Sequence, residues 1–95
     1  MGAKLLFRQK NIYPNGDIVE MKIWRVPDSD DKPHGLKYSL VYIQNGKIIL
    51  GFDNAEGKGD HKHYKGREYN YDFKSVDKLI KDFYGIIEKI RSGKQ

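Results

Sequence analysis

Residues 57–69, with the sequence GKGDHKHYKGREY, contain the side chains of this chain that are best suited to chemistry. His61 and His63 titrate near neutral pH and can act as an acid–base pair, and Asp60 can orient an imidazole. Tyr64 can donate a proton or stack on a base. Cleavage of RNA by its own 2′-hydroxyl needs such a pair. We therefore take these four residues as the catalytic candidates.

The same stretch supplies positive charge for the phosphorane oxygens of that reaction. The candidates for contact with nucleic acid are four cations and one nearby amide: Lys58, Lys62, Lys65, Arg67 and Asn54. Gly57 and Gly59 allow backbone amides to approach a phosphate closely. Spacing alone does not separate such a site from a solvated basic loop, so the solvated loop stays open as an interpretation.

The two histidines also suggest a metal site. Side chains at i and i+2 of an extended segment point to the same side, so His61 and His63 can bind one ion together. Asp60 and Asp53 are the first candidates to complete the ligand set. Further choices are Glu56, Glu68 and His34. Because the neighbouring cations repel a divalent ion, the sequence favours chemistry without a metal or other cofactor.

Length and composition fit one intracellular domain spanning residues 1–95. The 18 Lys and Arg against 13 Asp and Glu give a net charge of +5, which favours an RNA or an acidic protein as partner. The absence of cysteine fits a reducing cytoplasm. No apolar run approaches the roughly 20 residues of a membrane span, so we expect no membrane contact. A homodimer is possible.

Turn signals and alternation predict strands at about 4–13, 17–26, 36–44 and 47–53, with a possible fifth at 69–73. Asn45-Gly46 predicts a two-residue hairpin turn. A regular register would then pair Ile43 with Ile48, Val41 with Leu50 and Ser39 with Phe52 on one apolar face. Tyr38, Leu40 and Tyr42 would occupy the opposite, more aromatic face.

A helix is predicted at about 76–91, with Ser75 as its N-cap. Its apolar stripe consists of Val76, Leu79, Ile80, Phe83, Ile86, Ile87 and Ile90. Gly85 inside this helix suggests close packing against the sheet. The expected fold class is α+β: an antiparallel sheet of four or five strands, made of two consecutive hairpins, with one C-terminal helix packed on one face.

Several other residues have two interpretations. Trp24, Tyr38 and Tyr42 are either core residues or a platform on which bases stack. A phosphate track along the strands is conceivable from Arg8, Lys10, Lys22 and Arg25. His34 is expected to be exposed and without a function.

The chain resembles the TumE family of toxins from bacterial and archaeal toxin–antitoxin systems. The resemblance rests on Gly51-Phe52-Asp53-Asn54 followed by the run from Gly57 to Tyr64, on the segment 18–24 and on the downstream helix. Phe52 and Lys62 stand where the family pattern has tyrosine and arginine. The resemblance implies a growth-inhibiting protein whose partner is an antitoxin with a helix-turn-helix DNA-binding domain.

Three functions follow from these residues. The first is a toxin that cleaves RNA as a metal-independent endoribonuclease, with His61 and His63 as acid and base. The second is a toxin without catalysis, whose basic loop binds nucleic acid or protein. The third is a metal-dependent phosphodiesterase that uses Asp53, Asp60 and the two histidines.

Overall fold

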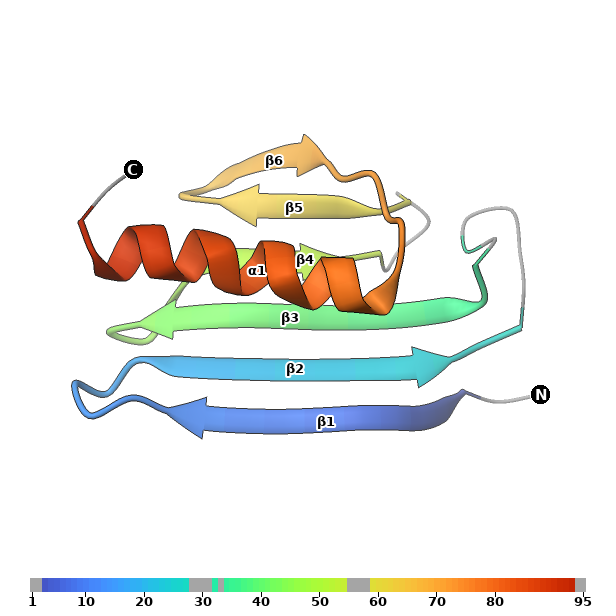
Figure 1. Ribbon diagram of the computed structural model, residues 1–95, viewed down its shortest axis with the longest axis horizontal. Coiled ribbons are helices and arrows are strands. Elements are labelled where there is room, and N and C mark those ends of the chain that lie inside the picture. Colours follow the sequence, from blue (N-terminus) through green and yellow to red (C-terminus); the bar gives the residue numbers. More distant parts are fainter. Residues whose placement is uncertain (1–2, 28–31, 33, 55–58, 94–95) are drawn as a thin grey trace.

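The computed structural model describes residues 3–27, 32, 34–54 and 59–93. In this part of the chain one antiparallel sheet is covered on one face by the helix α1 (Val76–Arg91), as Figure 1 shows. The six strands are β1 (Lys4–Ile12), β2 (Ile18–Arg25), β3 (Leu36–Gln44), β4 (Lys47–Asp53), β5 (His61–Tyr64) and β6 (Arg67–Asn70). Each strand pairs with the next along the chain, so the α+β class is confirmed.

The predicted count of four or five strands is wrong, because the residues expected to form a loop make a third hairpin. The HKHY run is β5, and the last strand ends at Asn70 instead of continuing to residue 73. The turn between β5 and β6 has positive φ at Lys65 (51°) and Gly66 (81°). Asn45 (52°) and Gly46 (76°) have the same conformation, which two-residue hairpins favour.

The predicted register of β3 and β4 holds only next to their turn. Ile43 pairs with Ile48 as expected, but an irregularity follows between Tyr42 and Ile43. Beyond this irregularity Tyr42 pairs with Leu50, and Leu40 pairs with Phe52. The extra residue of a bulge changes which side chains share a face. The predicted apolar face built on Val41 and Ser39 is therefore wrong.

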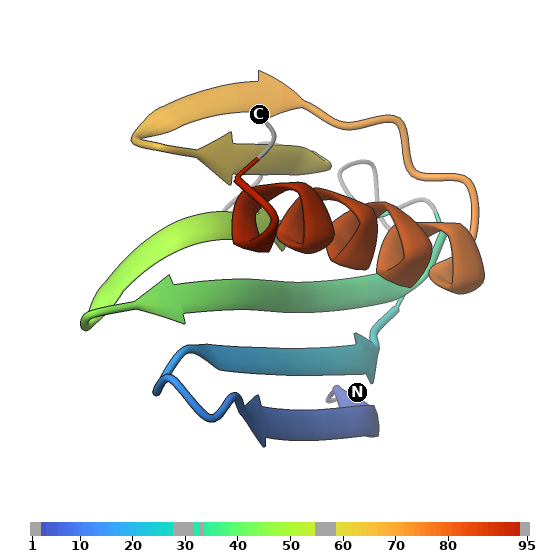
Figure 2. The ribbon, with the colours of Figure 1, turned by 60° about the vertical axis from the view of Figure 1, so that its left-hand side comes forward.

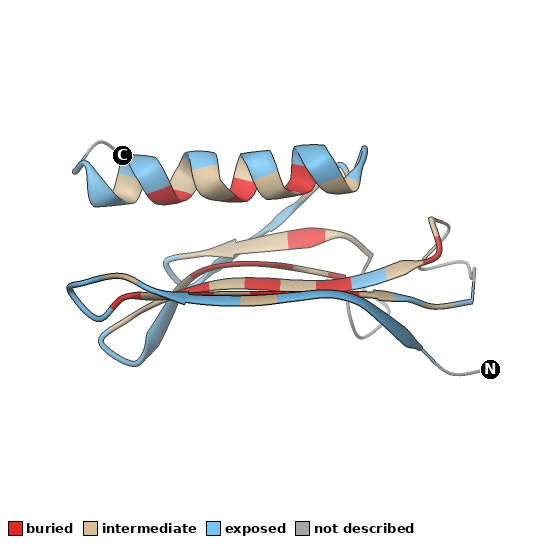
Figure 3. Cartoon of the chain, turned by 60° about the horizontal axis from the view of Figure 1, so that its bottom comes forward, coloured by how far each residue is buried: buried red, intermediate tan, exposed pale blue. Residues whose placement is uncertain are grey.

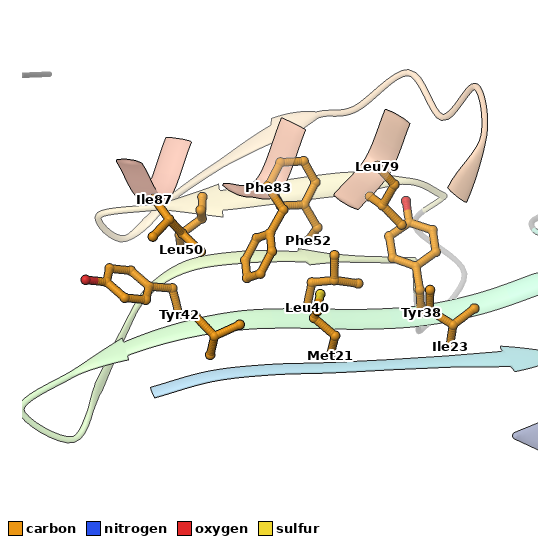
Figure 4. Packing of buried hydrophobic residues seen from close by; sticks show 11 residues of the cluster. Met21, Ile23, Tyr38, Leu40, Tyr42, Leu50, Phe52, Leu79, Phe83 and Ile87 are labelled. Atoms are coloured by element: carbon orange, nitrogen blue, oxygen red, sulfur yellow. The ribbon is translucent and has the colours of Figure 1, made fainter. Parts of the chain in front are cut away.

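The core lies between α1 and the central strands, where buried residues line the facing surfaces of the sheet and the helix (Figure 3). Its members are Val19, Met21, Ile23, Tyr38, Leu40, Tyr42, Leu50, Phe52, Leu79, Phe83 and Ile87. Figure 4 shows Phe83 of α1 above Phe52 of β4, and their rings meet edge to face at 5.9 Å. Because Tyr38 and Tyr42 belong to this core, they form no base-stacking platform.

The helix begins after Ser75, whose side chain accepts a hydrogen bond from the Lys78 amide, as its N-cap prediction requires. It runs across β3 and β4 and leaves β1 uncovered (Figure 2). The expectation of close packing at Gly85 is wrong, because Gly85 is exposed and a Cβ there would meet no atom within 4 Å. No helix in the described residues is long and apolar enough to cross a membrane.

A buried carboxylate ties the end of α1 to the start of β2. Asp17 accepts hydrogen bonds from the Tyr42 hydroxyl, from Gln44 and from the Arg91 guanidinium at 3.0 Å. Arg91 also lies over the Tyr13 ring at 3.7 Å. The hydrogen bond from Tyr42, with those from Gln44 and Asn15 and the charge of Arg91, lowers the pKa of Asp17 even though burial opposes the shift.

Candidate active site

The strand β5 places its alternate side chains on opposite faces of the sheet. Lys62 and Tyr64 pair with the core residues Phe52 and Leu50, so they lie on the face that α1 covers. His61 and His63 lie on the other face, which we call the open face. Its other positions include Arg8, Lys10, Glu20, Lys22, Trp24, Lys37, Ser39, Val41, Gly51 and Asp53. The strand thus separates Tyr64 from the two histidines.

On the open face, Asp53 of β4 joins the two imidazoles into what we call the imidazole–carboxylate centre. One carboxylate oxygen, Oδ1, lies 2.9 Å from Nε2 of His61, and Oδ2 lies 3.8 Å from Nε2 of His63. The two rings meet edge to face with centroids 4.8 Å apart. Glu68 of β6 places a second carboxylate 4.0 Å from Nε2 of His61. The structure thus brings together the two predicted histidines, with Asp53 between them.

Both ring nitrogens of His61 face oxygen atoms that accept hydrogen bonds. Nδ1 lies 3.0 Å from the carbonyl oxygen of Gly59, and a carbonyl only accepts, so Nδ1 carries a proton. In a neutral ring Nε2 then has a lone pair, which would face the Asp53 carboxylate at 2.9 Å. A proton between Nε2 and the carboxyl oxygen removes this conflict, and so does a bound metal ion.

The centre is reachable from solvent through His63 and Asp53. The side chain of His63 is 40% exposed and that of Asp53 is 30% exposed, whereas that of His61 is only 5% exposed. A hollow of about 380 Å³ borders His63 and Asp53, and apolar side chains including Val41 and Ile49 form its walls. A substrate group in this hollow would meet His63 and Asp53 directly, with His61 behind them.

Asp60 does not orient either histidine of the centre. It accepts a hydrogen bond from the Tyr38 hydroxyl at 2.7 Å and lies 3.1 Å from Nε2 of His34. Burial, together with this hydrogen bond, raises the pKa of Tyr38. The His34 ring also packs on Phe73 with centroids 4.2 Å apart. The expectation that His34 is exposed is therefore wrong, because it belongs to this second cluster.

The predicted nucleic-acid contacts do not gather at the centre. Asn54 is buried, and its side-chain amide donates to the Leu36 carbonyl and accepts from the Tyr38 amide, so it stabilises the beginning of β3. Arg67 pairs with Tyr64 and therefore lies, like Lys62, on the face toward α1. Lys65 sits in the turn, with its ammonium 5.3 Å from the Tyr64 ring. Lys58 and Gly57 lie outside the described residues.

Cations do occur on the open face, along β1, β2 and β3. Arg8 and Lys22 lie there as the phosphate-track interpretation expects, and both approach Glu20, at 3.6 Å and 3.8 Å. Lys37 was missed, although its pairing with Trp24 follows once the register of β2 and β3 is known. Its ammonium lies 5.3 Å from the Trp24 ring. Arg25 occupies the opposite face, because it alternates with Trp24.

Comparison with known proteins supports the resemblance found in the sequence. The sequence model described as toxin TumE matches residues 3–91. Neither a curated protein nor a solved structure matches the chain significantly. The match covers all six strands and the whole of α1, and with them both histidines and Asp53. The chain therefore belongs to the TumE family of toxins.

Proposed function

We propose that this toxin cleaves RNA at the imidazole–carboxylate centre of Asp53, His61 and His63. Membership of the TumE family supports the toxin role. The reaction is inferred from the side chains of the centre and from the cations on the same face. A helix-turn-helix antitoxin and a cytoplasmic site of action fit this proposal, and the resemblance to the family implies the antitoxin.

The geometry favours the metal-dependent route over the two-imidazole route. An acid–base pair must reach two oxygens of one phosphate, and both imidazoles must be free to exchange protons. His63 meets this condition, but His61 is buried and both its nitrogens face acceptor atoms. The observation that carries the proposal is this arrangement of His61, with Nδ1 held by a backbone carbonyl and Nε2 aimed at Asp53.

The residues of the centre fit a divalent metal ion. Two nitrogen atoms and a carboxylate oxygen, all within 4.8 Å of one another, form the donor set. Two donors each about 2.1 Å from a tetrahedral ion lie about 3.4 Å apart. The contacts of Asp53, 2.9 Å from Oδ1 to His61 and 3.8 Å from Oδ2 to His63, lie on either side of that value. The bond from His61 Nδ1 to Gly59 is the contact that commonly orients a metal-binding imidazole.

Asp53, His61 and His63 would hold such an ion, and Glu68 would add negative charge beside it. A bound ion supplies a Lewis acid for the phosphate and lowers the pKa of a bound water. Asp60 has no part in this set, since it bonds Tyr38 and His34. The mixed nitrogen and oxygen donors fit Zn²⁺ or Mn²⁺.

The RNA would lie along the open face. Lys37 occupies β3 two positions from Ser39, which pairs with Asp53, so it lies roughly 7 Å further along the neighbouring strand. Lys22 and Arg8 continue the positive charge across β2 and β1, with about 4.8 Å between strands. The hollow beside His63 offers room for one nucleotide group. A row of positive side chains across several strands favours a chain of phosphates over a single small anion.

Purified toxin should be incubated with single-stranded RNA, with and without a chelator. We expect cleavage that disappears with the chelator and returns with added Mn²⁺ or Zn²⁺. Asp53→Asn and His63→Ala should abolish cleavage while both proteins still fold. Asp72→Asn removes an equally charged but highly exposed side chain on the loop before α1 and serves as the matched control. Cleavage retained in His63→Ala would contradict the proposal.

The same assay separates the two remaining functions. Cleavage that resists the chelator and shows a bell-shaped pH profile would select the metal-independent pair, which the exposure of His63 supports. RNA binding that weakens steeply with salt but gives no product would select a binding module. In either case the metal-dependent proposal would be wrong.

A further inference from the structure

An apolar groove runs between the C-terminal half of α1 and the hairpin of β5 and β6. It consists of two adjoining hollows, of about 240 Å³ and about 340 Å³, which share Lys62, Ile86 and Lys89. We call it the helix groove. It lies on the face that α1 covers, so β5 separates it from the imidazole–carboxylate centre.

The wall of the helix groove is aromatic and aliphatic. Tyr64 and Tyr69 face Ile86 and Ile90 across the smaller hollow, and Phe52 and Tyr71 line the larger one. Tyr69 is 44% exposed, which is high for a large ring with apolar neighbours. A recess of this kind fits the apolar side chains of a protein partner, because the buried centre of a protein interface is apolar and often aromatic.

The charged groups that border the helix groove are mainly positive. Lys62, Lys81 and Lys89 line it. The carboxylate there is Asp82, which accepts a hydrogen bond from the Tyr71 hydroxyl at 2.8 Å and bonds Lys78 at 3.1 Å. Its charge is therefore already compensated within the chain. A partner with carboxylates around an apolar anchor would complement the lysines.

We propose that the helix groove binds an acidic, amphipathic segment of the antitoxin. Apolar side chains of the segment enter between Tyr69 and Ile90, and its carboxylates meet the lysine ammonium groups. The identification of this partner as an antitoxin rests on the proposed toxin function. RNA is a poorer occupant, because base recognition needs hydrogen-bonding groups and the smaller hollow is lined mostly by apolar atoms.

The position of the helix groove implies a particular kind of complex. Lys62 and Tyr64 contact the segment from one side of β5, while His61 and His63 lie on the other side. A segment in the helix groove therefore does not cover the centre. We expect the complex to bind Mn²⁺ or Zn²⁺ with the affinity of the free toxin.

The test uses the full toxin and the antitoxin that the resemblance to the family implies is encoded beside it, with affinities measured by calorimetry. Lys89→Glu and Tyr69→Ala should each weaken binding about tenfold or more. Two matched controls should leave the affinity unchanged. Lys47→Glu makes the same charge reversal in the turn region of β3 and β4, and Ile12→Ala truncates an exposed apolar residue of β1. Thermal melting of each variant verifies that it folds.

Equal affinity of the groove variants and their controls would overturn this inference, as would an antitoxin that does not bind the wild-type toxin. Loss of binding to a 20-nucleotide RNA in Lys89→Glu, with antitoxin affinity intact, would assign the groove to RNA instead and also overturn it. Asp53→Asn separates the two proposals. It should bind the antitoxin like wild type, so cleavage retained in that variant would refute only the catalytic proposal.

Discussion

His34 and His61 each lie close to an aspartate, but their backbone contacts favour different tautomers of the ring. Nδ1 of His34 accepts a hydrogen bond from the Leu36 amide, so Nε2 carries the proton that Asp60 accepts. A neutral ring satisfies both contacts. His61 meets the Gly59 carbonyl instead, so its neutral ring would satisfy only one. Proximity to an aspartate is common to both histidines. Of the two, only His61 has a neutral ring that leaves one contact unsatisfied, so His61 is the histidine suited to bind a further proton or a metal ion.

Asp53→Asn and Asp60→Asn should therefore fail in different ways. Asp53→Asn should lose the rise in melting temperature that Mn²⁺ or Zn²⁺ produces in wild type, because a ligand of the ion is gone. Asp60→Asn should keep that rise but lower the free energy of unfolding by about 1–3 kcal/mol, because Tyr38 loses a charged partner. Denaturant titrations with and without metal measure both. A metal-induced shift that survives in Asp53→Asn would contradict this assignment.

Asp17 should make the stability of the toxin depend on acid. Its pKa in the folded chain lies below the ordinary value of 3.8, so its contribution to stability is fully present above that value. The contribution is lost as the pH falls toward the lower pKa of the folded state. We expect the difference in unfolding free energy between wild type and Asp17→Asn to shrink between about pH 5 and pH 2. A difference that stays constant over this range would contradict the role of Asp17.

At the residue scale, the sequence sufficed to place His61 and His63 on one side of an extended segment. It also proposed Asp53 as a metal ligand. It assigned Asp60, Lys62 and Tyr64 to the same site as the histidines, because it treated the segment as a loop. Alternation in β5 turns Lys62 and Tyr64 to the opposite face, and Asp60, just before the strand, contacts Tyr38 and His34.

Among the elements, the hairpin of β5 and β6 was missed because its turn is Lys65-Gly66. Asn45-Gly46 is recognisable because asparagine and glycine both tolerate positive φ. Lys65 adopts the same conformation without that preference. The signal that remains is a pair of four-residue runs, HKHY and REYN, around a glycine. The bulge beside Tyr42 was also unpredictable, since a side-chain pattern does not show where an extra residue enters a strand.

Two glycines should respond oppositely to the same substitution. Gly85 lies exposed inside α1 with open space around it, so Gly85→Ala should stabilise the chain by up to about 1 kcal/mol. Gly66 has a φ of 81°, which alanine rarely adopts, so Gly66→Ala should destabilise it. Chemical denaturation measures both changes. A loss of stability in Gly85→Ala would show that the helix packs more tightly than its surroundings indicate.

For the whole molecule, the stability of the fold depends on the contact between α1 and the sheet. Ile87 is 1% exposed and belongs to the core. Ile87→Lys would place an unpaired ammonium there, which costs several kcal/mol against a total stability of about 5–15 kcal/mol. We expect this variant to be unfolded by circular dichroism, whereas Glu88→Lys at the neighbouring exposed position should fold. A cooperative melt of Ile87→Lys near the wild-type temperature would contradict this expectation.

The apolar stripe of α1 was predictable because it follows a simple period of apolar residues. The helix face of β3 was assigned to the wrong residues, because the bulge beside Tyr42 changes which side chains of β3 and β4 share a face. The position of β1 at the sheet edge also follows from consecutive hairpins. β1 exposes Leu5, Leu6 and Phe7 along this edge. The sequence suggested a homodimer without placing its contact, and the homodimer stays a prediction.

β5 has only four residues, and it contributes side chains to both the imidazole–carboxylate centre and the helix groove. A change in its length should therefore be tolerated less well than a substitution within it. Losing Lys62 would shift His61 by one position relative to His63 and turn its imidazole toward α1. The same deletion would remove a lysine from the helix groove. Under the two proposals, a single lost codon would therefore impair both the catalytic centre and the binding of the antitoxin, whereas an exchange of lysine for arginine at that position should preserve both.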